Sequence, residues 1–168
     1  MNHLHCIQKI TNDLIETYQT RCPFAISEAK GIKIKYCNDF HDLKGAHVII
    51  AGTPYIFLKA DLEEQEKKLV CAHELGHDIL HNDVHVSSYS FSSLSDNRML
   101  EREANIFAAH LLIDDNQTDE LIRSGYELSQ VAAILEVDEQ LALFKINEMI
   151  RRGYRYKLNR SPSPFFLK

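Results

Sequence analysis

Apolar positions in the first third of the chain change from a helical to an extended spacing. Near the N-terminus they recur every three or four residues, which predicts a helix over residues 3–20 that ends before Pro23. Residues 31–36 then alternate between apolar and polar, and the short apolar runs 47–51 and 55–58 indicate two further strands around a turn. The pattern therefore predicts a small sheet, which we expect to be antiparallel.

The rest of the chain has helical periodicity with one long interruption. A helix is predicted from Asp61 to about His81, and Glu64 stands three residues after Asp61, close to a capping box. The serine-rich segment 82–97 follows, and it is either a mobile flap or a plain connector. Further helices are predicted over residues 98–113, 116–124, 127–136 and 138–151. Together with the sheet, these helices predict an α+β fold.

Length and composition narrow the class of protein without giving its chemistry. A chain of 168 residues can bury a real core as one domain, with or without a small appendage. The net charge of -5 gives no general attraction to nucleic acid or anionic membranes. No apolar run approaches the roughly 20 residues that span a bilayer, and the N-terminus has no signal core. The 4 cysteines are widely spaced, as in a reduced protein, so we expect a cytoplasmic location.

The most informative stretch is His73-Glu74-Leu75-Gly76-His77 in the middle of the helix predicted over 61–81. Two histidines four residues apart lie on one face of a helix and can share a zinc ion, and the glutamate between them can serve as general base of a metallopeptidase. The plain alternative is a surface helix with two solvated histidines. Gly76 costs about 1 kcal/mol relative to alanine in a helix, which suggests close approach of a strand, the metal or a substrate backbone.

A catalytic zinc usually takes three protein ligands and a water, so a third ligand is needed. The next predicted helix offers Glu101 and Glu103, which lie about 200° apart around its axis. Only one of them can therefore face the metal, and the other is expected to be a solvated carboxylate. Asn105, one turn after Glu101, is a candidate for orienting His73 or His77 from behind. We expect no metal ligand from His81, because a helix curves away from an ion over two turns.

The two helices together resemble the ImmA/IrrE family of metallopeptidases. That family combines the histidine motif with a second helix of the pattern E-x-x-A-(N or D)-x-F-A-x-x-L-L, which this chain matches from Glu101 to Leu112. The resemblance extends over roughly residues 30–150 and implies Glu101 as the third metal ligand. The chain departs from the family where a proline usually follows the Leu-Leu pair, because Ile113-Asp114 stands there. This departure affects the end of the helix and not the metal chemistry.

The resemblance implies a zincin-like metallopeptidase domain over residues 1–114 and a C-terminal helical region over 115–168. Zinc held by His73, His77 and Glu101 would activate a water, and Glu74 would take its proton. Mn²⁺ or Fe²⁺ can use the same ligands. The family further implies a narrow protein substrate, a helix-turn-helix transcriptional repressor of a mobile element or stress response. The alternative is a non-proteolytic, metal-binding transcriptional regulator that acts by binding protein or DNA.

The C-terminal region has a helix-turn-helix-like pattern around residues 131–137. A DNA-reading helix begins with basic or amide side chains, whereas the helix after this turn begins with Asp138-Glu139-Gln140, which repels phosphate. Basic residues gather only at 151–160, where a helix C-terminus favours them. We therefore expect a packing or protein-docking module and no direct contact with nucleic acid or membrane.

Overall fold

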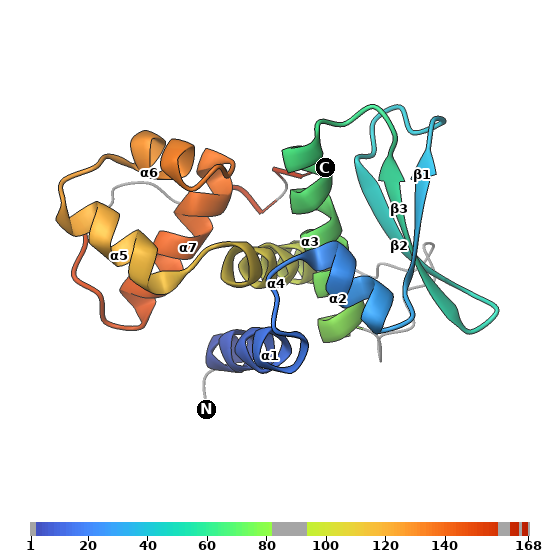
Figure 1. Ribbon diagram of the computed structural model, residues 1–168, viewed down its shortest axis with the longest axis horizontal. Coiled ribbons are helices and arrows are strands. Elements are labelled where there is room, and N and C mark those ends of the chain that lie inside the picture. Colours follow the sequence, from blue (N-terminus) through green and yellow to red (C-terminus); the bar gives the residue numbers. More distant parts are fainter. Residues whose placement is uncertain (1–2, 82–93, 158–161, 165, 168) are drawn as a thin grey trace.

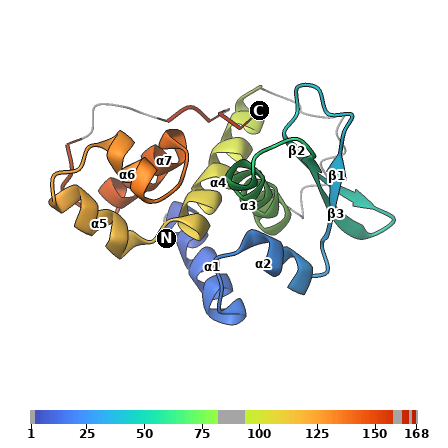
Figure 2. The same ribbon diagram turned by 45° about the horizontal axis from the view of Figure 1, so that its top comes forward.

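The computed structural model describes the chain except for residues 1–2, 82–93, 158–161, 165 and 168. The described part has an α+β fold, with a small sheet at one end, α5 to α7 at the other and α3 and α4 between them (Figures 1 and 2). The elements are α1 (His3–Tyr18), α2 (Pro23–Ala29), β1 (Lys33–Cys37), β2 (Gly45–Ile50), β3 (Thr53–Lys59), α3 (Glu64–His81), α4 (Leu94–Leu112), α5 (Asp115–Arg123), α6 (Leu128–Ile134) and α7 (Glu139–Arg151).

The sheet is mixed, so the expectation of an antiparallel sheet is wrong for one of its two pairings. The strand order is β1-β3-β2, with β3 parallel to β1 and antiparallel to β2. β2 and β3 form a hairpin through Ala51 and Gly52, whose φ angles of 48° and 77° are both positive, as a two-residue turn of this hand requires. The hairpin inserts β3 between β2 and β1. Alternation along each strand predicts its two faces but carries no information on which strand lies beside it.

Two helices begin several residues away from their predicted starts. α3 begins at Glu64, three residues later than predicted, and α4 begins at Leu94, within the segment expected to be a loop. The remaining residues of that segment, 82–93, lie outside the described part, and so does the expected flap. α2 was not predicted, because seven residues are too few for a periodic pattern to stand out. It begins at Pro23, which suits the first turn of a helix, and it buries Ile26 completely.

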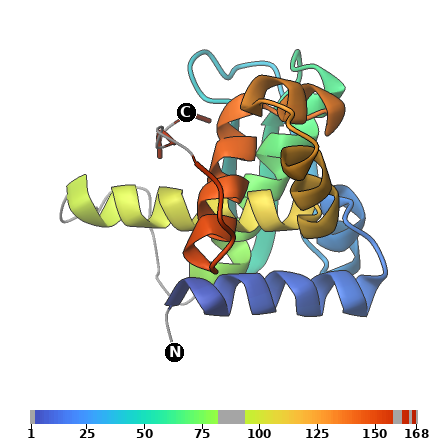
Figure 3. The ribbon, with the colours of Figure 1, turned by 90° about the vertical axis from the view of Figure 1, so that its left-hand side faces the viewer.

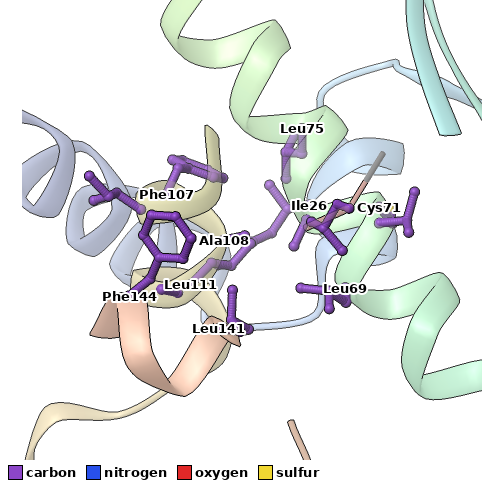
Figure 4. Packing of buried hydrophobic residues seen from close by; sticks show 14 of the residues in the cluster. Ile26, Leu69, Cys71, Leu75, Phe107, Ala108, Leu111, Leu141 and Phe144 are labelled. Atoms are coloured by element: carbon purple, nitrogen blue, oxygen red, sulfur yellow. The ribbon is translucent and has the colours of Figure 1, made fainter. Parts of the chain in front are cut away.

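α4 is the central helix of the molecule. It packs against α1, α3 and α7, and Figure 3 shows α1 running along it and α7 crossing it. From Ala104 to Leu111 all of its residues are buried, whichever way they face. The apolar core in Figure 4 continues from Leu69 and Leu75 of α3 through Phe107 of α4 to Leu141 of α7. The division of the chain at residues 114 and 115 stays a prediction.

Ile113-Asp114 follows the Leu-Leu pair, where the family pattern usually has proline, and Asp114 lies between α4 and α5. Its side chain accepts hydrogen bonds from the backbone N–H groups of Asn116 and Gln117, and so caps the N-terminus of α5. The guanidinium of Arg21 lies 2.9 Å from the same carboxylate and also donates to the last carbonyls of α4. Asp114 therefore caps the start of α5, and Arg21 binds carbonyls near the end of α4. In the described residues, no helix is long and apolar enough to cross a membrane.

Candidate metal centre

The two histidines of the motif lie on one face of α3, one turn apart. Their Nε2 atoms are 3.1 Å from each other, and their ring centroids are 4.8 Å apart. His73 is buried and His77 is partly exposed, so the pair lies at the edge of the core with one side open. The alternative of two solvated histidines on a surface helix does not fit this position.

Gly76 allows α4 to approach this face of α3. A Cβ at Gly76 would lie 3.1 Å from Phe107 Cδ1 and 3.2 Å from Ala104 Cα, both of α4. The close approach inferred from the sequence is therefore that of the neighbouring helix, and neither a strand nor a substrate backbone is needed to explain it. The contact brings α4 near enough for its carboxylates to reach the histidines.

Glu101 completes a cluster of three donor groups with His73 and His77. Its carboxylate oxygens lie 3.3 Å from His73 Nε2 and 3.7 Å from His77 Nε2. Ligands about 2.0–2.1 Å from a tetrahedral zinc are about 3.3 Å from one another. The Nε2–Nε2 separation is 3.1 Å, and the separations of 3.3 and 3.7 Å end on the two different oxygens of Glu101. These values lie near that of a zinc site, so the two imidazoles and the carboxylate could hold a divalent metal here.

Asn105 lies behind His73, on the side away from the cluster. Its Oδ1 is 2.9 Å from His73 Nδ1, while its amide nitrogen donates to the carbonyl of Pro164 at 2.8 Å. The bond to Pro164 fixes which way the amide points, so Oδ1 faces the imidazole and Nδ1 carries the proton. His73 Nε2 then has its lone pair directed at Glu101 and His77.

His81 and Glu103 form a second buried pair that sequence reasoning missed. His81 Nδ1 is 3.1 Å from His77 Nδ1, and His81 Nε2 is 3.0 Å from Glu103 Oε2. The expectation that one of the two glutamates is solvated is wrong, since Glu101 and Glu103 are each only 5% exposed. That expectation assumed that α4 has a solvent face, but neighbouring helices cover it on several sides. His110, on the same helix, lies in a different cluster with Lys145.

Glu74 is a buried carboxyl beside the cluster. Burial raises its pKa and Glu101 adds to the rise, while His73 and a backbone hydrogen bond from His47 oppose it. β2 can supply that bond because Gly45 brings it close to α3: a Cβ there would lie 3.2 Å from Glu74 Cγ. The carboxyl is thus a stronger base than an exposed glutamate, and it is near enough to His73 and Glu101 for their charges to affect its pKa.

His47 is a further residue at the site that the sequence did not single out. Its Nε2 lies 3.0 Å from Asp78 Oδ1, and Asp78 is buried on α3 directly after His77. The contact holds β2 against the motif helix. The only available signal was a histidine at the start of an apolar strand, and that signal is too common to select it.

Comparison with known proteins supports this arrangement of groups. The IrrE N-terminal-like domain family of peptidases matches residues 27–147. The chain is 28% identical to "Uncharacterized immunity region protein 2" of Bacillus phage phi105, over 83% of this chain and 88% of that one. It is 25% identical to "Metallopeptidase ImmA" of Bacillus subtilis (strain 168), over 85% of each. A cluster suited to a divalent metal and a family match over most of the chain agree: the chain belongs to the ImmA/IrrE family of metallopeptidases.

Proposed function

We propose that the chain is a zinc-dependent, site-specific endopeptidase whose substrate is a helix-turn-helix transcriptional repressor. The observation that carries the proposal is the convergence of His73 Nε2, His77 Nε2 and the Glu101 carboxylate within 4.8 Å of one another. Glu74 lies next to these atoms as a buried base. This combination of three metal-binding groups and a separate carboxyl is what metal-assisted hydrolysis of a peptide bond requires.

In this proposal His73, His77 and Glu101 hold the metal, which when bound acidifies a water and polarises the peptide carbonyl. Glu74 accepts a proton from the attacking water at a carboxylate oxygen. It then delivers that proton to the amide nitrogen as the carbon–nitrogen bond breaks. Its raised pKa makes the carboxylate a better proton acceptor than an exposed glutamate, as the first step requires. Mn²⁺ and Fe²⁺ can bind the same ligands. We propose zinc because it binds imidazole nitrogen well.

The substrate is proposed from the relatives and not from the site. One relative is named for the immunity region of a phage, and the family resemblance implies a repressor of a mobile element or stress response as the substrate. Cleavage would remove that repressor in the cytoplasm, where it binds DNA. The helix-turn-helix-like C-terminal region would serve as a docking module for the substrate, since α7 begins with Asp138 as its N-cap and Glu139 in its first turn. Both side chains would repel DNA phosphates.

Glu74→Gln tests the role of the base, because glutamine keeps the shape and cannot take the proton. We expect zinc content to be retained and cleavage of the repressor encoded beside this gene to fall by at least about 100-fold. Glu64→Gln, in the first turn of α3 and exposed, is the matched control and should cleave normally. Full proteolysis by a zinc-loaded Glu74→Gln protein would rule out the general-base role.

A chelator separates peptidase action from regulation without cleavage. Incubation of the purified protein with the neighbouring repressor should give a single cut that disappears with chelator and returns with zinc. An intact repressor in a stable, stoichiometric complex would instead support the non-proteolytic regulator.

A further inference from the structure

We propose that His81 and Glu103 are positioning residues that set the hydrogen-bonding state of His77, so that its Nε2 lone pair faces the metal site. The inference rests on the metal site of the proposed function. It concerns metal binding, which can be measured whether or not the protein cleaves a repressor.

The three side chains form a continuous chain of hydrogen bonds between α3 and α4. His77 Nδ1 is 3.1 Å from His81 Nδ1, and His81 Nε2 is 3.0 Å from Glu103 Oε2. His81 is 7% and Glu103 5% exposed, so solvent contributes little to either contact. His77 and His81 are one turn apart on α3, which places their rings at a centroid separation of 5.3 Å.

A neutral His81 beside a carboxylate gives this chain of hydrogen bonds one direction. A carboxylate only accepts hydrogen bonds, so His81 Nε2 must donate to Glu103. The other nitrogen of a neutral His81 then carries a lone pair and accepts from His77 Nδ1. His77 Nδ1 is therefore protonated, and Nε2 is left with a lone pair directed at His73 and Glu101.

The opposite direction would prevent metal binding by His77. If His81 donated from Nδ1, His77 Nδ1 would have to accept and Nε2 would carry the proton. That proton would point into the cluster, where a ligand needs a lone pair. Glu103 disfavours this arrangement because it accepts the proton of His81 Nε2, which leaves His81 Nδ1 as an acceptor.

The two ligand histidines are thus oriented in different ways. His73 donates to the neutral amide of Asn105, whereas His77 donates to a histidine that is itself held by a carboxylate. Carboxylate partners raise the basicity of ligand imidazoles. The negative charge that a carboxylate would bring at position 105 is therefore supplied by Glu103, through His81 and His77.

The tautomers can be read directly from the unmodified protein. In the zinc-loaded full chain labelled with ¹⁵N-histidine, long-range proton–nitrogen correlation spectra should show His77 protonated at Nδ1 and His81 protonated at Nε2. A His81 ring protonated at Nδ1 alone would overturn the proposal. This measurement needs no variant, so it does not depend on how substitutions fold.

Zinc affinity of variants tests whether the chain of hydrogen bonds matters for binding. At one fixed pH, competition with a chromophoric chelator should show affinity reduced about 10–100-fold in His81→Leu, the usual effect of losing such a partner. Glu103→Leu should also weaken binding, by more than tenfold, whereas Glu103→Gln, whose oxygen can still accept from His81, should stay within about tenfold of the wild type. Thermal melts in chelator check that each variant folds.

Equal losses in Glu103→Gln and Glu103→Leu, or wild-type affinity in a folded His81→Leu, would contradict the inference. Either result leaves the peptidase proposal intact if the repressor is still cut. A wild-type protein that binds zinc with the expected tautomers but cuts no repressor would refute the proposed function and leave the inference standing.

Discussion

α4 carries two buried polar clusters that balance their charge in different ways. The histidine–glutamate cluster, formed by His73, His77 and Glu101, lies against the first half of the helix. The Lys145 network, formed by His110, Asp115, Lys145 and Arg152, lies at its last turn. In the Lys145 network both cations come from the chain, since Lys145 and Arg152 contact the two oxygens of Asp115. In the histidine–glutamate cluster, we propose that a bound metal ion is the cation.

The cost of burial shows in the Lys145 network. Burial lowers the pKa of Lys145 to about 8, although the charge of Asp115 favours the protonated form. Burial together with the charge of Lys145 lowers the pKa of His110 to about 3. Asp115 has its pKa lowered because the bonds from Arg152 and Lys145 outweigh its own desolvation. The same helix therefore buries ionisable groups in two ways: as a self-contained network that holds α7 in place, and as a set of donors suited to an added ion.

The largest expected effect comes from breaking the Lys145 network at its anion. Asp115→Asn leaves the ammonium of Lys145, 2% exposed, without its counter-charge, and should lower the free energy of unfolding by about 3–5 kcal/mol. Adding Lys145→Met should restore most of the loss, because the remaining buried charge is removed. Urea unfolding measures both, with Asp13→Asn in the exposed Lys9–Asp13 pair as the control that should change little.

Zinc should stabilise the folded protein through the histidine–glutamate cluster and not through the Lys145 network. With free zinc at about 1,000 times Kd, the folded state should gain about 4 kcal/mol, so chelation lowers the melting temperature and zinc restores it. Glu101→Gln should remove most of this shift, while Asp115→Asn should keep it in full because its cluster binds no metal. A melting temperature of the wild type that does not respond to zinc would remove the difference between the two clusters.

A smaller effect is expected from the amide behind His73. Asn105→Ala removes the acceptor for Nδ1 and should weaken zinc binding about 10–100-fold, or roughly 1.4–2.7 kcal/mol. Asn105→Asp should recover most of the affinity, because its carboxylate can still accept from His73 Nδ1. It loses the bond to the Pro164 carbonyl. Chelator competition on both variants checks this order, and an unchanged affinity in Asn105→Ala would show that His73 needs no such partner.

The most gradual effect is the acid response of His110. Because its pKa is about 3 in the folded state against 6.5 ordinarily, the unfolded chain binds the extra proton first as pH falls. Stability should therefore decrease by at most about 1.4 kcal/mol per pH unit below about 6.5, with no contribution above that pH. His110→Gln should flatten the curve of unfolding free energy between pH 6 and 4 relative to the wild type. Parallel curves for the two proteins would contradict the shift.

Contacts between residues close together in the sequence could be predicted from its pattern, whereas Glu101 was placed with the histidines only through the family resemblance. The four-residue spacing of His73 and His77 fixes their common face on any helix, and the distances agree with that expectation. The pairing of Glu103 with His81 and of His47 with Asp78 was not predictable in the same way. Each joins two elements, and the pairing depends on how those elements pack.

The sequence alone predicted every described helix and strand except α2, and the helix face that carries His73 and His77. Local geometry suffices for these, because side-chain directions within an element repeat at a fixed period. The family followed from the motifs of two helices. The order of the sheet, the burial of both Glu101 and Glu103, and the pairing of Lys145 and Arg152 with Asp115 emerge only in the folded structure. The physical reason is close packing: Gly76 and Gly45 let α4 and β2 approach α3, and that approach selects which side chains meet.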